Sequence, residues 1–149
     1  MADVETRLLI DAPPQLVWER FMDKGRWKTF SDFVDLNPGQ PIEQGCTFWF
    51  ALRLLRLPPV PLRVEVLRCV PLREVRWVGG IPAFPLFRGE HYFRFEDAGE
   101  GRTRLMHGED FSGPLRRAFL LLLGDAVRQA YIRFNEGLAD QAWLAGRRS

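Results

Sequence analysis

The part of the chain that most constrains its fold lies between Leu86 and Trp143. It contains two segments in which apolar and polar residues alternate, followed by one long apolar stripe. Every second residue of the two segments belongs to one mostly apolar face, made up of Phe87, Gly89, His91, Phe93 and Phe95, then Thr103, Leu105, His107, Glu109 and Phe111. Side chains alternate between the two faces of a strand, so we expect a β-hairpin with an apolar inner face. Apolar residues then recur at helical spacing from about Leu115 to Leu144, which predicts one long helix that covers this face.

The apolar inner face of this predicted hairpin also carries polar side chains. His91 and His107 are the only two histidines of the chain, and Glu109 lies on the same face. Small-molecule sites are usually apolar cavities that contain a few placed polar groups. The pattern therefore predicts a binding cavity, although it does not identify the ligand.

The rest of the chain predicts more short strands and two short helices. The strands are expected at residues 4–10, 46–54, 62–70 and 74–78, and the helices after Asp11-Ala12-Pro13-Pro14, with Asp11 as capping residue, and around residues 24–30. Strands joined by short turns form an antiparallel sheet. We therefore predict an α+β helix-grip fold, in which a curved antiparallel sheet of about seven strands wraps around the C-terminal helix. The two short helices close one end, and residues 1–149 form a single domain.

Composition excludes several classes of protein. The chain has 149 residues, of which 46% are hydrophobic and 27% charged, and its formal net charge is only +2. Its arginines are scattered among acidic residues rather than gathered with stacking aromatics, so we expect no nucleic-acid partner. The longest apolar run is far shorter than the ~20 residues that span a bilayer, so we expect no stable membrane insertion. The acidic N-terminus lacks the apolar segment of a signal peptide, and Cys46 and Cys69 form no CxxC pair, so we expect a cytoplasmic protein with free thiols.

Several motifs together resemble the helix-grip (SRPBCC) superfamily of pollen-allergen-like proteins, START lipid-transfer domains and polyketide cyclases, in particular its small bacterial branch. They are Ile10-Asp11-Ala12-Pro13 with Val17-Trp18, Asp23 and Trp27; Trp77-Val78-Gly79-Gly80; Phe87-Arg88-Gly89-Glu90-His91; Thr103 to Gly113; and Asn135 with Leu138. Phe30 departs from the pattern, since a second tryptophan is usual there. The resemblance implies the helix-grip fold over nearly the whole chain. It does not choose among the functions of the superfamily, whose members carry lipids, bind hormones, cyclise polyketides or assist other proteins.

His91, His107 and Glu109 are the candidate catalytic residues. A turn at residues 97–101 pairs His91 with His107, whereas a shift of two residues pairs it with Glu109, and in both registers the three are close neighbours. Four interpretations stay open: anchors for the polar end of an apolar guest, an acid/base set, ligands of a metal ion, or buried polar groups that satisfy one another. No HExxH-like spacing supports a metal site and no cofactor motif accompanies the cluster, so we expect neither a metal nor a cofactor.

The predicted ligand-binding residues combine this cluster with aromatic and apolar side chains. They are Trp27, Phe30, Trp49, Trp77, Phe84, Phe87, His91, Phe93, His107, Glu109, Phe111, Phe119 and Leu123. Trp27, Phe30 and Phe84 are expected at the cavity mouth, because they lie in helical or loop segments. For each aromatic the alternative is an ordinary core position. The connection Leu52 to Pro61 is unusually apolar and could form a lid or a contact surface.

The leading functional hypothesis is the binding or transport of a small hydrophobic molecule that is lipid-like, polyketide-like or aromatic. A second hypothesis is a cyclase, aromatase or dehydratase that uses the His91/His107/Glu109 cluster in the same cavity. A third is a surface-acting assembly or regulatory protein with a filled core, which would use the stretch from Leu52 to Leu62. A homodimer also stays open, since nothing in the sequence specifies one.

Overall fold

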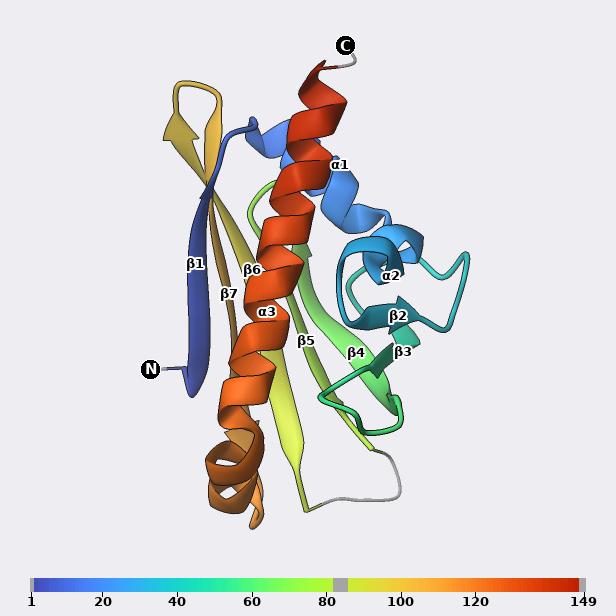
Figure 1. Ribbon diagram of the computed structural model, residues 1–149. Helices are drawn as coiled ribbons and strands as arrows, with labels where there is room; N and C mark the ends of the chain where they lie inside the picture. Colours follow the sequence, from blue (N-terminus) through green and yellow to red (C-terminus); the bar gives the residue numbers. More distant parts are fainter. Residues whose placement is uncertain (1, 82–85, 148–149) are drawn as a thin grey trace.

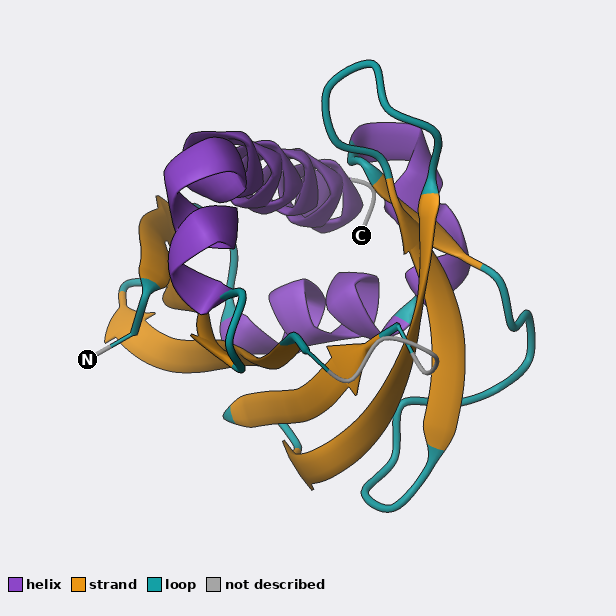
Figure 2. Ribbon diagram, turned by 90° about the horizontal axis from the view of Figure 1, so that it is seen from below, coloured by secondary structure: helices purple, strands orange, loops and turns teal. Residues whose placement is uncertain are grey.

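The computed structural model describes residues 2–81 and 86–147, in which seven strands form one antiparallel sheet in the order β1-β7-β6-β5-β4-β3-β2. The strands are β1 (Val4–Ile10), β2 (Phe33–Asp35), β3 (Thr47–Leu52), β4 (Val60–Val70), β5 (Glu74–Gly80), β6 (Arg88–Gly99) and β7 (Arg102–Ser112). The helices are α1 (Pro14–Met22), α2 (Trp27–Phe30) and α3 (Arg116–Arg147), with a 3-10 turn (Lys24–Arg26) before α2. The sheet curves around α3 (Figures 1 and 2), so the predicted helix-grip fold is confirmed.

Two details of the first third of the chain differ from expectation. Helix α1 starts after Pro13, and no side chain caps it, so the predicted cap at Asp11 is wrong. Strand β2 was not predicted, because three residues are too few to show an alternating pattern. A buried ion pair holds this strand in place: Lys24 Nζ lies 2.7 Å from Asp35 Oδ1 and donates to the carbonyl of Asn37 at 2.7 Å.

The central hairpin β6–β7 has the second of the two registers considered. His91 pairs with Glu109, and Phe93 pairs with His107. The strands pair up to Gly99 and Arg102, so the turn is shorter than the expected turn at residues 97–101, and this moves the pairing by two residues. An irregularity between Asp97 and Gly99 lies next to the turn. The inner and outer faces are nevertheless those expected from the alternation, because a shift of two residues keeps each side chain on its face.

Helices α1 and α2 pack against the C-terminal half of α3 at one end of the molecule (Figure 1), and aromatic side chains fill this end. Phe134 of α3 is fully buried at the centre of this packing, with ring contacts to Phe21, Trp27, Phe30, Phe33 and Phe93. Gly137 lets Phe30 approach the helix, since a Cβ at this position would overlap the Phe30 ring. This end of the molecule is therefore closed.

The N-terminal turns of α3 are packed much less. Leu122 lies within the apolar helix predicted from about Leu115 to Leu144, but its side chain is mostly exposed, because α1 and α2 do not extend to this end of the sheet. A Cβ at Gly124 would meet nothing within 4 Å, so no described element packs closely against α3 at this glycine. Helix α3 thus has a buried C-terminal half and a half-free N-terminal half.

Candidate functional site

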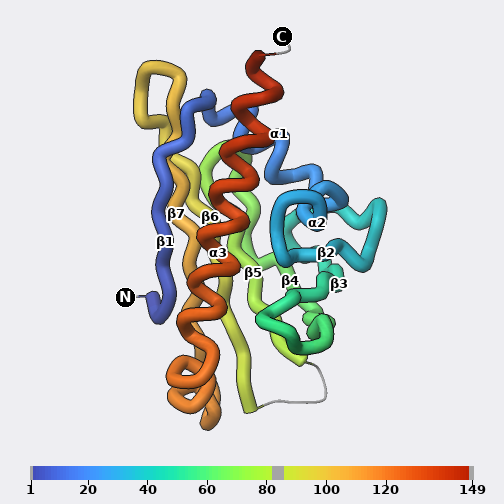
Figure 3. The backbone as a smooth tube through the Cα atoms, viewed as in Figure 1, coloured from blue at the N-terminus to red at the C-terminus, as the bar shows by residue number. Residues whose placement is uncertain are grey.

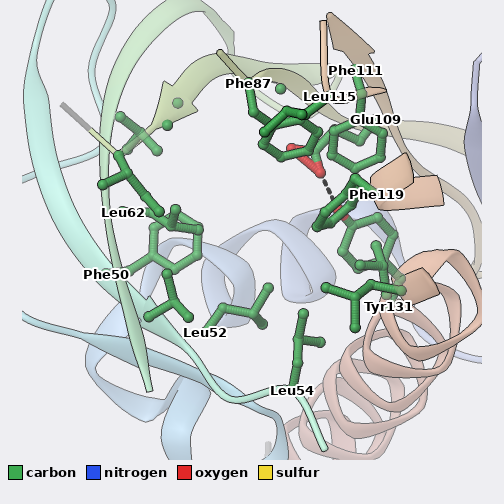
Figure 4. A pocket seen from close by; sticks show the side chains of 18 of the residues that line it. Phe50, Leu52, Leu54, Leu62, Phe87, Glu109, Phe111, Leu115, Phe119 and Tyr131 are labelled. Atoms are coloured by element: carbon green, nitrogen blue, oxygen red, sulfur yellow. Dashed lines mark hydrogen bonds between the residues drawn. The ribbon is translucent and has the colours of Figure 1, made fainter. Parts of the chain in front are cut away.

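A cavity of about 420 Å³ lies between the sheet and the N-terminal half of α3 (Figure 4). It is lined by Phe50, Leu52, Leu54, Leu57, Val60, Leu62, Val64, Trp77, Gly79, Gly80, Ile81, Phe87, Gly89, Glu109, Phe111, Leu115, Ala118, Phe119, Leu122, Leu123, Val127 and Tyr131. Of these described residues only Glu109 and Tyr131 have ionisable side chains. Both the size and the apolar wall are typical of small-molecule sites. The surface-acting hypothesis required a filled core, and the cavity contradicts that requirement.

The mouth of the cavity is marked by lining residues whose side chains are also largely exposed: Leu57, Ile81, Leu115 and Leu122. They come from the β3–β4 connection, the end of β5 and the start of α3. These segments lie together at the end of the molecule opposite α1 (Figure 3). The mouth is therefore at the opposite end from the one predicted for Trp27 and Phe30, while Phe84 lies outside the described residues.

Glycine makes room for the carboxylate in the cavity wall. Gly89 of β6 lies beside Glu109 of β7, and a Cβ at Gly89 would overlap the Glu109 carboxylate, with its carboxyl carbon only 2.8 Å away. Tyr131 of α3 donates a hydrogen bond from its hydroxyl to Glu109 Oε2 across the cavity wall (Figure 4). Burial, followed by the neighbouring Glu109, raises the pKa of Tyr131 well above its usual value, so the phenol keeps its proton and remains a donor.

A chain of buried polar groups extends from Glu109 back into the core. His91 Nδ1 lies 3.6 Å from Glu109 Oε2, and His91 Nε2 lies 2.7 Å from His107 Nε2. His107 Nδ1 lies 2.7 Å from Asn135 Oδ1, and Asn135 Nδ2 donates to the Thr6 hydroxyl at 2.8 Å. The predicted neighbours His91, His107 and Glu109 are thus adjacent, although of the three only Glu109 lines the cavity.

The directions of these hydrogen bonds follow from Thr6, the last group of this buried polar network. The Thr6 hydroxyl donates its one proton to the carbonyl of His107, so it accepts from the Asn135 amide, whose oxygen then accepts from His107 Nδ1–H. Burial, followed by the nearby His91, holds the pKa of His107 well below its usual value. A neutral His107 that is protonated on Nδ1 must accept at Nε2, and His91 Nε2 is the donor.

This leaves His91 Nδ1 facing Glu109 Oε2 at 3.6 Å, which is too far for a direct hydrogen bond. Two acceptors that face each other inside the protein cost free energy unless one of them carries a proton. A proton taken up by this pair would be held on the imidazole or on the carboxylate. The arrangement can therefore present either a hydrogen-bond acceptor or a proton to a guest in the cavity.

Folding stability should fall as the pH drops below 6.5. Folded His107 is neutral because its pKa is lowered, whereas an unfolded histidine binds a proton near pH 6.5. The contribution of neutral His107 to the free energy of unfolding is therefore complete above pH 6.5. Below pH 6.5 it is lost by at most about 1.4 kcal/mol per pH unit. Urea unfolding at pH 5, 6, 7 and 8 measures this slope, and His107→Gln should reduce it. A flat profile from pH 7 to 5, or a ring NMR titration of folded His107 near pH 6.5, would contradict the assignment.

Six of the predicted ligand-binding residues line the cavity in the structure: Trp77, Phe87, Glu109, Phe111, Phe119 and Leu123. The others that the structure describes lie elsewhere. Trp27 and Phe93 are fully buried core residues, Phe30 packs on Gly137, and His91 and His107 lie behind the wall. Trp49 lies on the outer face of β3 and is partly exposed, because the inner face of that strand carries Phe48 and Phe50.

Sequence reasoning missed several lining residues, and Tyr131 is the most important of them. Tyr131 follows Val127 by four residues, so helical spacing alone could have placed it on the inner face of α3. Phe50, Leu52 and Leu62 were also missed, although the apolar inner faces of β3 and β4 contain them. The alternation of apolar and polar residues, which predicted the inner face of the central hairpin, could also have identified these three residues.

A protein-family model described as "Polyketide cyclase / dehydrase and lipid transport" matches residues 1–142. The chain belongs to this family. The expected membership in the SRPBCC superfamily is thereby confirmed. No curated protein sequence matches the chain. Membership in the polyketide cyclase/dehydrase and lipid transport family supports hydrophobic-ligand binding or cyclase activity in general, and it does not decide between them.

Solved structures similar to this polyketide cyclase/dehydrase family member share its fold at low sequence identity. A hypothetical protein from Helicobacter pylori is 15% identical with a TM-score of 0.75, and the match covers 93% of this chain and 86% of that one. The Zhui aromatase/cyclase from a Streptomyces species is 18% identical with a TM-score of 0.73, covering 93% and 92%. A conserved protein from Geobacillus kaustophilus is 12% identical with a TM-score of 0.71, covering 95% of each. At these identities the likeness establishes the fold alone.

Two further observations concern the described part of this family member. None of its helices is both long and apolar enough to cross a membrane. Within residues 2–81 and 86–147, no three His, Cys, Asp or Glu side chains are arranged so that they could hold a metal ion.

Proposed function

We propose that this protein binds one small hydrophobic molecule in the cavity and holds a polar group of that molecule at Glu109 and Tyr131. The observation that carries the proposal is a single carboxylate–phenol pair in a wall that is otherwise apolar. A guest that buries about 300 Å² of apolar surface gains about 7 kcal/mol before the costs of association are subtracted. Apolar contact then supplies most of the affinity, and the polar pair sets the orientation.

The polar pair favours a guest that carries a hydroxyl group. Glu109 accepts a hydrogen bond from Tyr131 and keeps further acceptor capacity on its oxygens. A phenol or alcohol on the guest can donate to that carboxylate in a site shielded from water, where charge-assisted hydrogen bonds are strong. This proposal places a lipid-like, polyketide-like or aromatic alcohol in the cavity.

The test compares 2-naphthol with naphthalene, which lacks the hydroxyl, by isothermal titration calorimetry. Glu109→Gln should weaken 2-naphthol binding about tenfold, because a neutral amide replaces the charged acceptor, while naphthalene binding should change less than threefold. Glu96→Gln, an exposed position on the outer face of β6, is the matched control. Equal weakening of both guests would contradict a polar anchor, and no binding of either guest would contradict the cavity proposal itself.

The adjacency of His91 and Glu109, whose Nδ1 and Oε2 atoms lie 3.6 Å apart, favours a second candidate, an enzyme that performs cyclase or dehydratase chemistry. Glu109 would exchange the proton with substrate, since of the three it alone reaches the cavity. His91 would position Glu109 and share its proton, and His107 would hold His91 in the required tautomer. Turnover of polyketide-like substrates that is lost in Glu109→Gln, with 2-naphthol still bound, would favour this candidate. Unchanged rates in the variants of all three residues would exclude it.

A further inference from the structure

The cavity mouth is surrounded by exposed leucines. Leu121 is 86% exposed and Leu122 77% on the first turns of α3, while Leu55 is 71% and Leu57 51% exposed on the β3–β4 connection. Leu57 and Leu122 line the cavity, and Leu55 and Leu121 lie beside lining residues in the sequence. Apolar side chains with this degree of exposure, gathered at one opening, are typical of an interaction surface.

Three segments form the mouth: the β3–β4 connection, the end of β5 with the residues that follow it, and the start of α3. They carry arginine and no acidic residue. Residues 52–62, 79–89 and 112–124 contain Arg53, Arg56, Arg88, Arg116 and Arg117, and all 19 Asp and Glu residues of the chain lie elsewhere. Arg116 is paired with Asp3. The other four arginines are exposed and form no ion pair among the described residues. These three segments therefore carry positive charge, although Glu90, Asp110 and Asp125 flank them and the whole chain has a formal net charge of only +2.

We propose that the open end of the cavity docks reversibly on a lipid bilayer that carries anionic headgroups. The arginines would contact the lipid phosphates, while Leu55 and Leu121 would enter the boundary between headgroups and acyl chains. Docking in this orientation places the mouth against the bilayer. An apolar guest then passes between membrane and cavity without crossing water.

Two observations favour a bilayer over a protein partner. The exposed leucines belong to the β3–β4 connection and to the first turns of α3, two separate segments at the cavity mouth, and a fluid bilayer can contact both without a complementary shape. The arginines are interleaved with the leucines in the sequence, as in Leu52-Arg53-Leu54-Leu55-Arg56-Leu57. Arg53, Leu55, Arg56 and Leu57 of this run are exposed, so charged and apolar side chains lie next to one another on the connection, as at a membrane interface.

The test is flotation of the full chain with vesicles of phosphatidylcholine alone or mixed equally with phosphatidylglycerol. The wild type should bind the mixed vesicles at least tenfold more strongly. Arg53→Gln/Arg117→Gln should weaken that binding about thirtyfold, since each arginine near an anionic surface contributes about fivefold. Leu55→Ser/Leu121→Ser should weaken it at least tenfold. None of these four residues lines the cavity, so binding of 2-naphthol should stay unchanged and shows that each variant is folded.

Matched control variants carry the same changes far from the mouth: Arg7→Gln/Arg104→Gln and Leu9→Ser/Leu144→Ser, all at exposed positions. They should float as the wild type does. A wild type that floats with neither kind of vesicle, or controls that lose binding equally, would overturn the proposal. Self-association that the Leu55→Ser/Leu121→Ser variant abolishes, without flotation, would assign the surface to a second copy and would also overturn it. Vesicle binding needs no cavity ligand, so its failure is distinguishable from failure of the proposed function.

Discussion

Leu62→Trp/Leu123→Trp should remove ligand binding while the fold stays intact. The two leucines line the cavity from β4 and α3, that is, from opposite walls, and both are only partly buried. Two indole rings would occupy much of a cavity of about 420 Å³. If a guest loses about 100 Å² of apolar contact, it loses about 2.5 kcal/mol, which is a roughly sixty- to hundredfold weaker affinity.

Titration of the cavity-blocking variant with 2-naphthol and naphthalene measures this effect, and both guests should be affected alike. Leu9→Trp/Leu144→Trp adds the same two rings at exposed positions outside the cavity and should bind as the wild type does. Unfolding curves of the two variants should agree within about 1 kcal/mol. Unchanged affinity in a folded blocked variant would show that the guests bind elsewhere.

Phe134→Ala should destabilise the protein by about 3–5 kcal/mol, the cost of deleting a fully buried aromatic ring. Phe134 lies among Phe21, Trp27, Phe33 and Phe93, at the point where α3 meets both short helices and the sheet. These rigid neighbours are held by one another, so the space left behind cannot collapse.

Urea unfolding at pH 7 measures the loss, and Leu144→Ala on the same helix is the control. Leu144 is 44% exposed near the end of α3, so its truncation should change the free energy of unfolding much less. A loss below about 1 kcal/mol for Phe134→Ala would contradict the described core. A loss of the same size for Leu144→Ala would show that the end of α3 is packed more tightly than the structure indicates.

The faces of the central hairpin could be predicted from the sequence, but its register could not. A period of two assigns His91, His107 and Glu109 to one face whatever the pairing. The pairing depends on the turn, which is shorter than expected because the strands pair up to Gly99 and Arg102, and an irregularity between Asp97 and Gly99 shifts the register next to it. Local sequence does not determine such an irregularity, because its free energy depends on how both strands pack against their neighbours.

The candidate site was predictable in part for a similar reason. Glu109 was found because a carboxylate on an apolar strand face is conspicuous. Tyr131 was missed, since its partner comes from another element 22 residues away, and only the packing of α3 on β7 brings them together. Trp27 was assigned to the mouth because it lies in a short helix, whereas the short helices close the opposite end. Element types follow from local patterns, but the end at which a cavity opens follows from tertiary packing.

Native mass spectrometry of the purified chain beside Leu62→Trp/Leu123→Trp tests the central claim most directly. Both proteins would be incubated with an extract of bacterial lipids and aromatic metabolites, and any bound compound would be released by denaturing extraction. We expect the wild type to carry one added mass that extracts as an apolar compound with a hydroxyl group, and the blocked variant to carry none. A wild type that shows only its own mass after this incubation, or a blocked variant that carries the same compound, would contradict binding in the cavity.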